Sequence, residues 1–180
     1  MKLGVVGFGL RGRSLIGLAK KSFSVEAAAV CDSVEANLVA AKQDYPHAHL
    51  FSSFDQMLDE VKLDALLVET PATSHATICS QALARNIPVM SDVPAVATVD
   101  EAHELWRAQQ SSRGFYMLGA NANLWGFADA AVDLVKQGKL GEPYYMEAEY
   151  LHDIREYFDK TPWRKNYESI RYCTHSLGPL

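Results

Sequence analysis

Three closely spaced glycines near the N-terminus are the first residues suited to chemistry. Gly7, Gly9 and Gly12 fit the pattern G-x-G-x-x-G, and the motif follows a short apolar run. Asp32 ends the next apolar run, 20 residues after Gly12. Such glycines let the backbone approach a pyrophosphate at a helix N-terminus, and an acidic residue at this distance binds ribose hydroxyls. The spacing predicts a dinucleotide site formed by Asp32 together with Gly7, Phe8, Gly9, Leu10, Arg11 and Gly12.

The charge of Asp32 bears on the choice between the two nicotinamide cofactors. A carboxylate at the ribose would repel the 2′-phosphate of NADP, so the sequence favours NAD(H). Arg11 and Arg13 keep NADP open, because a nearby arginine can accommodate that phosphate.

Further polar residues follow three later runs of strand-like composition. Parallel strands present their carboxyl ends at one edge of the sheet, where ligands bind. Pro71 and His75 also suit a simple turn and helix start. We add to the predicted cofactor site the residues Thr70, Pro71, His75, Asp92, Val93, Pro94 and Asn121.

The elements that must position these residues alternate between short β-rich runs and amphipathic helices. The predicted strands are Leu3–Gly7, Val25–Cys31, His49–Ser52, Asp64–Glu69, Pro88–Ser91 and Phe115–Ala120. The predicted helices are Arg11–Lys20, Val34–Tyr45, Phe54–Val61, His75–Arg85 and one from Thr98 to about Ser111, where Thr98 and Glu101 form a capping-box pattern. Repeated β-α-β units of this kind predict an α/β fold for residues 1–122, a doubly wound parallel sheet of the Rossmann type.

The pattern changes after Asn123. A helix is expected at Gly126–Gln137, closed by Gly138, and Glu142–His152 alternates like a half-exposed strand. Asp153–Tyr172 has little periodicity and is predicted to be a long functional loop. We expect residues 123–180 to begin an α+β, mixed-sheet domain for substrate binding and homo-oligomer formation. One helix and one strand cannot cover a sheet face, so the chain is expected to be a piece of a longer protein or to borrow a partner.

Composition excludes several classes of function. The 180 residues carry a formal net charge of −5 and are 48% apolar, which argues against a general binder of nucleic acid or membrane surfaces. Cys31, Cys79 and Cys173 are far apart and form no metal-binding spacing. No apolar run approaches the ~18–20 residues that span a bilayer, and no signal peptide is evident. We expect a cytoplasmic protein without a metal.

The chain resembles the Gfo/Idh/MocA family of NAD(P)-dependent oxidoreductases. The resemblance lies in the glycine motif, in Asp32, in Thr70-Pro71 with His75, and in Asp92-Val93-Pro94. Most members of that family have Glu-Lys-Pro after the fifth strand, and the lysine is catalytic beside the nicotinamide and the substrate. Val93 stands at this position and can neither donate nor accept a proton. The usual dehydrogenase mechanism through that lysine is therefore excluded.

A narrower resemblance accounts for Val93. The NAD-dependent α-N-acetylgalactosaminidases, a glycoside hydrolase branch of this family, also have an acid-Val-Pro element. The chain resembles them further at Tyr150-Leu151-His152-Asp153, at Trp163-Arg164 and at Tyr172-Cys173-Thr174-His175-Ser176-Leu177-Gly178-Pro179. The branch has a motif close to Tyr-Pro-Thr-His-Gly-Leu-Gly-Pro at the last position, from which Cys173 and Ser176 depart.

The resemblance implies glycoside hydrolysis by transient oxidation. NAD⁺ would take a hydride from C3 of the sugar, a base would remove the C2 proton, the aglycone would leave C1, water would add, and the hydride would return. The resemblance assigns the acid–base steps to Tyr172 and His175, and substrate binding to His152, Trp163 and Arg164. A structural role for each of these side chains is the alternative. Two other functions stay open: a plain NAD-dependent sugar or polyol dehydrogenase, and a non-catalytic NAD-binding or sensing protein.

Overall fold

A computed structural model describes residues 1–168 and 171–180 of the chain. Ser169 and Ile170, which belong to the predicted loop Asp153–Tyr172, lie outside the described residues. The chain divides into two compact units, Met1–Leu118 and Gly119–Leu180.

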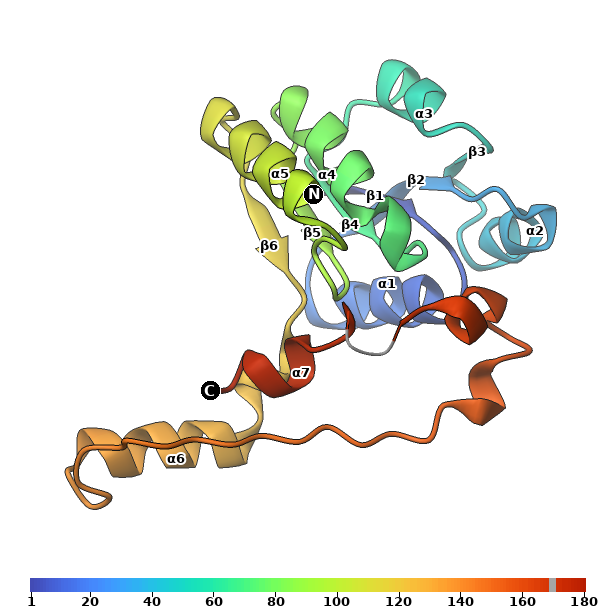
Figure 1. Cartoon of the computed structure of the whole chain (residues 1–180). Helices are drawn as coiled ribbons and strands as arrows, with labels where there is room; N and C mark the ends of the chain where they lie inside the picture. Colours follow the sequence, from blue (N-terminus) through green and yellow to red (C-terminus); the bar gives the residue numbers. More distant parts are fainter. Residues whose placement is uncertain (169–170) are drawn as a thin grey trace. The chain divides into compact units, whose positions relative to one another are not determined.

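The first unit is built on a parallel sheet of six strands (Figure 1). In chain order they are β1 (Lys2–Val6), β2 (Glu26–Cys31), β3 (His49–Phe51), β4 (Ala65–Val68), β5 (Val89–Ser91) and β6 (Tyr116–Leu118). Their order in the sheet is β3-β2-β1-β4-β5-β6, and each neighbouring pair is parallel. The strand order reverses between β1 and β4, which is the point where such sheets bind dinucleotides. The predicted doubly wound parallel sheet is confirmed.

Helices cover both faces of this sheet because its strands are apolar on both sides. One face packs against α1 (Leu10–Ser22) and α2 (Glu35–Asp44). The opposite face packs against α3 (Phe54–Glu60), α4 (His75–Ala84) and α5 (Val99–Ser111). Within β4, Leu66 and Val68 join the core under α3 and α4, whereas Leu67 joins the core under α1. The predicted capping box at the start of α5 is present.

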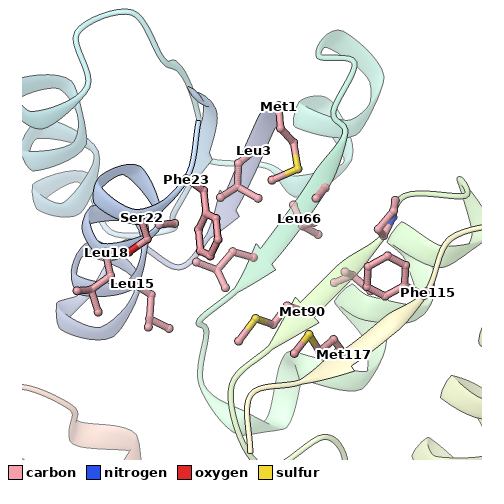
Figure 2. A pocket seen from close by; sticks show the side chains of 15 residues that line it. Met1, Leu3, Leu15, Leu18, Ser22, Phe23, Leu66, Met90, Phe115 and Met117 are labelled. Carbon is pink, nitrogen blue, oxygen red and sulfur yellow. The ribbon is translucent and has the colours of Figure 1, made fainter. Parts of the chain in front are cut away.

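Part of the α1 face is left uncovered by the helices of this unit. A hollow of about 360 Å³ lies between α1 and the strands β4, β5 and β6. Figure 2 shows it lined by apolar side chains, among them Leu15, Leu18, Phe23, Met90, Phe115 and Met117. Met1 and Leu3, at the start of β1, also line it, so it lies toward the amino ends of the strands. The hollow is therefore not part of the cofactor site, which is predicted at the opposite edge of the sheet.

The second unit contains short helices joined by long connections. They are η2 (Asn121–Leu124), α6 (Gly126–Lys136), η3 (Arg155–Tyr157), η4 (Pro162–Asn166) and α7 (Thr174–Leu177). α6 ends near the predicted position, because Gly138 adopts φ +68° and its N–H donates to the Val135 carbonyl. α6 and α7 both contact η2.

The predicted strand at Glu142–His152 is wrong for this structure. None of these residues forms a strand, and most of their side chains are exposed, with Tyr144 fully so. A strand is stabilised by hydrogen bonds to a neighbour, and the described part of this unit contains no strand that could pair with the segment. Alternating sequence alone does not make a strand without a partner.

Candidate functional site

The glycine turn after β1 is shaped by two close backbone approaches. Gly7 has φ +88°, in the left-handed region, and a Cβ there would lie 2.6 Å from the Glu69 carbonyl. A Cβ on Gly12 would lie 2.0 Å from the Gly7 carbonyl oxygen. Only glycine at both positions lets α1 start directly on top of the turn.

The N-terminus of α1 is open at Gly9. This residue is the N-cap, no side chain caps the helix there, and a Cβ on it would meet nothing within 4 Å. The N–H groups of the first helical turn have no partner inside the helix, and together with the helix dipole they favour an anion. The turn thus fits the pyrophosphate of a dinucleotide.

Asp32 is held in place by the same turn. Its carboxylate accepts hydrogen bonds from the Phe8 N–H at 2.7 Å, the Val34 N–H at 2.8 Å and the Asn37 side-chain amide at 3.0 Å. A carboxylate has about four acceptor positions. The Asp32 side chain is therefore fixed at the end of β2 with acceptor capacity left for a ribose hydroxyl.

The two arginines that kept NADP open are both engaged with carboxylates. The Arg13 Nε lies 2.6 Å from the Asp44 carboxylate, and the Arg11 Nε lies 3.3 Å from that of Asp92. Their charges are already paired, which supports Asp32 as the group that selects the cofactor.

His75 joins the two loops that follow β4 and β5. Its Nδ1 lies 2.8 Å from the Pro94 carbonyl oxygen and its Nε2 lies 2.8 Å from that of Thr70, while the ring is only 1% exposed. Both partners are acceptors, so whichever ring nitrogen carries the proton donates to its carbonyl. His75 thereby positions the loops after β4 and β5.

Three residues of the predicted cofactor site have buried side chains. The side chains of Phe8, Val93 and His75 are 1%, 4% and 1% exposed. The Phe8 ring packs edge-on against Tyr45, with ring centres 5.9 Å apart. These side chains are core groups, and contact of the three residues with a cofactor stays a prediction.

A buried carboxyl at the same edge was missed by the sequence prediction. Glu69 directly follows β4, its side chain is 0% exposed, and its oxygens make no hydrogen bond within the described part of the chain. Burial, and secondarily the nearby Asp92 carboxylate, raises the pKa of Glu69 to about 8, although Arg11 opposes the shift. A charged residue at the end of an otherwise apolar strand was the available signal.

In the second unit, an aromatic cluster gathers around His175. The His175 ring centre lies 5.4 Å from that of Tyr172, 4.7 Å from that of Tyr150 and 6.2 Å from that of Trp125, with which it stacks. α7 begins at Thr174 as expected, and Tyr172, two residues before it, lies close to His175.

The predicted substrate residues belong to this same cluster. His152 contacts Tyr150, with ring centres 6.0 Å apart. The Arg164 guanidinium lies over the rings of both Trp163 and Tyr172, at 4.5 and 5.4 Å from their centres. All five residues predicted for catalysis and substrate binding are thus brought together, and Trp125 and Tyr150 are members that the prediction omitted. Asn121 begins η2, and its contact with a cofactor stays a prediction.

The described residues contain no group of three or more side chains suited to hold a metal ion. Cys31 and Cys79 are core residues, and burial raises the pKa of the Cys31 thiol to about 11 and that of Cys79 to about 12. Among the described helices, none combines the length and apolar character needed to cross a membrane.

Comparison with known proteins identifies the family. Residues 1–120 match a family described as an oxidoreductase family with an NAD-binding Rossmann fold. The chain belongs to the Gfo/Idh/MocA family. NAD is the cofactor of the family's Rossmann fold, and the uncapped α1 terminus, the open space at Gly9 and the fixed Asp32 carboxylate fit it.

The curated relatives carry a glycosidase name. A glycosyl hydrolase family 109 protein of Solibacter usitatus is 28% identical over the whole chain, which covers 45% of that protein. Another from Shewanella sp. is 27% identical, again over the whole chain and 43% of the relative. The chain therefore spans less than half the length of these relatives.

Solved structures share the fold. The apo scyllo-inositol dehydrogenase of Lactobacillus casei is 25% identical, with a TM-score of 0.72 over 79% of this chain and 43% of that one. The WlbA dehydrogenase of Bordetella pertussis, solved with NADH and UDP-GlcNAcA, has a TM-score of 0.79 at 23% identity, over 91% of this chain and 50% of that one.

The glycine turn yields a prediction that separates binding from folding. Gly9→Ala adds a methyl group that touches no protein atom, so NAD affinity should fall roughly tenfold or more while the melting temperature stays unchanged. Gly12→Ala should instead destabilise the fold, because its Cβ would meet the Gly7 carbonyl. Calorimetric titration and thermal melts measure the two effects. Gly17→Ala, in the middle of α1 with open space around it, is the control. Equal affinity of Gly9→Ala and the unmodified chain would contradict the pyrophosphate placement.

Cofactor preference should depend on Asp32. Asp32→Asn keeps the size but removes the negative charge, so the ratio of NADP to NAD affinity should rise by roughly tenfold. Titration with both cofactors measures it, with the exposed Asp55→Asn on α3 as the control. An unaltered ratio would show that Asp32 does not face the ribose.

Glu69 should make stability depend on pH. Its folded pKa of about 8 lies above its ordinary value of 4.5, so the folded state holds the proton more tightly and stability falls as pH rises between these values. The Glu69→Gln side chain cannot ionise. The melting temperature of this variant minus that of the unmodified chain should therefore increase from about pH 5 to about pH 8.5. A constant difference across this range would mean that Glu69 titrates normally in the folded state.

Proposed function

We propose that the chain carries the NAD-binding unit and the acid–base groups of an NAD-dependent sugar-modifying enzyme that hydrolyses glycosides. The observation that carries the proposal is the aromatic cluster in which Tyr172 and His175 lie with His152, Trp163 and Arg164. These are the residues in which the chain resembles the NAD-dependent glycosidases, and its curated relatives bear a glycosidase name.

The first unit supplies the cofactor site in this proposal. The α1 N-terminus at Gly9 binds the pyrophosphate, Asp32 binds the adenosine ribose, and the segments at Thr70 and Asp92 flank the nicotinamide half. A bound NAD⁺ supplies hydride acceptance and return at C3 of the sugar. Val93 provides no proton-transfer group here, so the acid–base chemistry is assigned to the second unit.

Tyr172 is the base that removes the C2 proton. A phenol titrates near pH ~10, and a neighbouring cation favours its ionised form. The Arg164 guanidinium, 5.4 Å from the Tyr172 ring centre, supplies such a charge. C2 becomes acidic only once C3 is a ketone, which is why hydride removal precedes this step.

His175 exchanges a proton with the C3 hydroxyl, for which an imidazole is suited near neutral pH. Its stacking on Trp125 and its contact with Tyr150 fix the orientation of the ring. Trp163 offers an aromatic face to the sugar, and His152 and Arg164 offer hydrogen bonds to its hydroxyls. The substrate is therefore a small carbohydrate glycoside, and the reaction has no net change in oxidation state.

A panel of p-nitrophenyl glycosides with NAD⁺ tests the proposal. Nitrophenol release without accumulation of NADH is the expected result. Accumulation of NADH would instead favour a sugar or polyol dehydrogenase, as the scyllo-inositol dehydrogenase neighbour would suggest. NAD binding with neither signal would favour a non-catalytic NAD-binding protein. Measured on the whole protein, either of the last two results would overturn glycoside hydrolysis; the chain alone spans less than half the length of its relatives and is expected to show little or no turnover.

Variants and solvent deuterium test the individual steps. Turnover in D₂O should place deuterium at C2 of the released sugar, and its absence would exclude elimination. Tyr172→Phe should abolish exchange at C2, and His175→Ala should slow the hydride step, each by roughly 10²–10⁴-fold. The exposed Tyr144→Phe and His103→Ala are matched controls that should retain full rates.

A further inference from the structure

Glu69 combines complete burial with a lack of hydrogen bonds. Its side chain is 0% exposed, and neither carboxyl oxygen finds a hydrogen-bond donor within the described part of the chain. An isolated buried carboxylate is strongly disfavoured, whereas a protonated carboxyl is neutral. Such a group at a ligand-binding edge calls for a functional explanation.

One cation serves two carboxyl groups at this position. The Arg11 Nε lies 3.3 Å from the Asp92 carboxylate but 3.9 Å from that of Glu69. Arg11 from α1 and Asp92 from the loop after β5 are the charged groups that shift the titration of Glu69, and Asp92 opposes its ionisation. The positive charge of Arg11 therefore mainly neutralises Asp92, and Glu69 keeps its proton at neutral pH.

Glu69 follows β4 and packs against Gly7 and Gly12, next to the strand ends where the nicotinamide half of the cofactor is expected. Asp32 at the end of β2 marks the adenosine side, and Gly9 marks the pyrophosphate. The other half of the dinucleotide then extends across the carboxyl ends of β4 and β5, which lead into Glu69 and Asp92. The oxidised nicotinamide ring carries a positive charge, and the reduced ring is neutral.

We propose that Glu69, Asp92 and Arg11 form a site that distinguishes the charge of the nicotinamide ring, in which Glu69 releases its proton when the oxidised ring binds and keeps it when the reduced ring binds. The step is a proton transfer from the Glu69 carboxyl to the buffer, leaving a carboxylate beside a cation, and no electrons move. The inference rests on NAD as the cofactor of the proposed function and not on its sugar chemistry.

The proposal has a consequence that differs between the two forms of the cofactor. NAD⁺ and NADH share the pyrophosphate and the adenosine, so any difference in proton release comes from the ring. A charge on the ring strengthens its attraction to an ionised Glu69, because that carboxyl lies in a medium of low dielectric constant. NAD⁺ binding should therefore strengthen relative to NADH binding as the pH rises.

Calorimetric titration of the chain with NAD⁺ and with NADH, in buffers of different ionisation enthalpy, measures the protons released. Near pH 7 we expect NAD⁺ to release a substantial fraction of one proton more than NADH does. Between pH 6.5 and 8.5 the ratio of NAD⁺ to NADH affinity should rise, by about threefold or more and at most tenfold per pH unit. No sugar is present, so the result is independent of whether the protein hydrolyses glycosides.

Glu69→Gln is nearly isosteric and cannot ionise. It should still bind both cofactors, but the excess proton release and the rise in affinity ratio should disappear. The exposed Glu60→Gln on α3 is the matched control and should behave like the unmodified chain. A thermal melt of each variant establishes that it is folded. Equal proton release by NAD⁺ and NADH, or an excess release that survives in Glu69→Gln, would overturn the inference and leave Glu69 as a core residue only.

Discussion

The close approach of α1 to the turn after β1 is the constraint on which the cofactor half depends. With no Cβ at Gly12, the helix begins against the Gly7 carbonyl, at the end of β1, next to which the strand order reverses. The same turn presents the Phe8 N–H to Asp32, so the ribose-binding carboxylate is positioned by the backbone that shapes the pyrophosphate site. One backbone geometry thus places two recognition groups.

Polar side chains then fasten the loops at the carboxyl edge of the sheet. His75 binds the carbonyls of Thr70 and Pro94, and Arg11 joins the first turn of α1 to Asp92. Glu69 lies beneath this edge without a hydrogen bond of its own. A site organised before the cofactor arrives costs less to order on binding, and it also lets a buried carboxyl respond to the charge of the ligand.

The two units differ in how their functional groups are held. In the first unit the positions follow from backbone hydrogen bonds and sheet register, which are directional. In the second unit the rings of Trp125, Tyr150 and Tyr172 each contact that of His175, and the Arg164 guanidinium lies over the Tyr172 ring. Val93 stands in place of the family's lysine. The proposed function therefore assigns proton transfer to the aromatic cluster of the second unit and cofactor binding to the first unit.

The sequence by itself determined the doubly wound sheet, its strand positions, the glycine turn and Asp32, because apolar periodicity and glycine spacing are local properties of the chain. The resemblance to the glycosidases selected five residues of the aromatic cluster as site residues, but not Trp125 or Tyr150. Only the tertiary structure decided that Glu147 and its neighbours form no strand, since pairing needs a partner that alternation cannot supply. It also decided that His75 and Phe8 lie in the core, that Arg11 and Arg13 are paired, and that Glu69 is a buried acid. The burial, ion pairing and ionisation of a side chain depend on which distant segments of the chain contact it, and these contacts cannot be read from a single sequence.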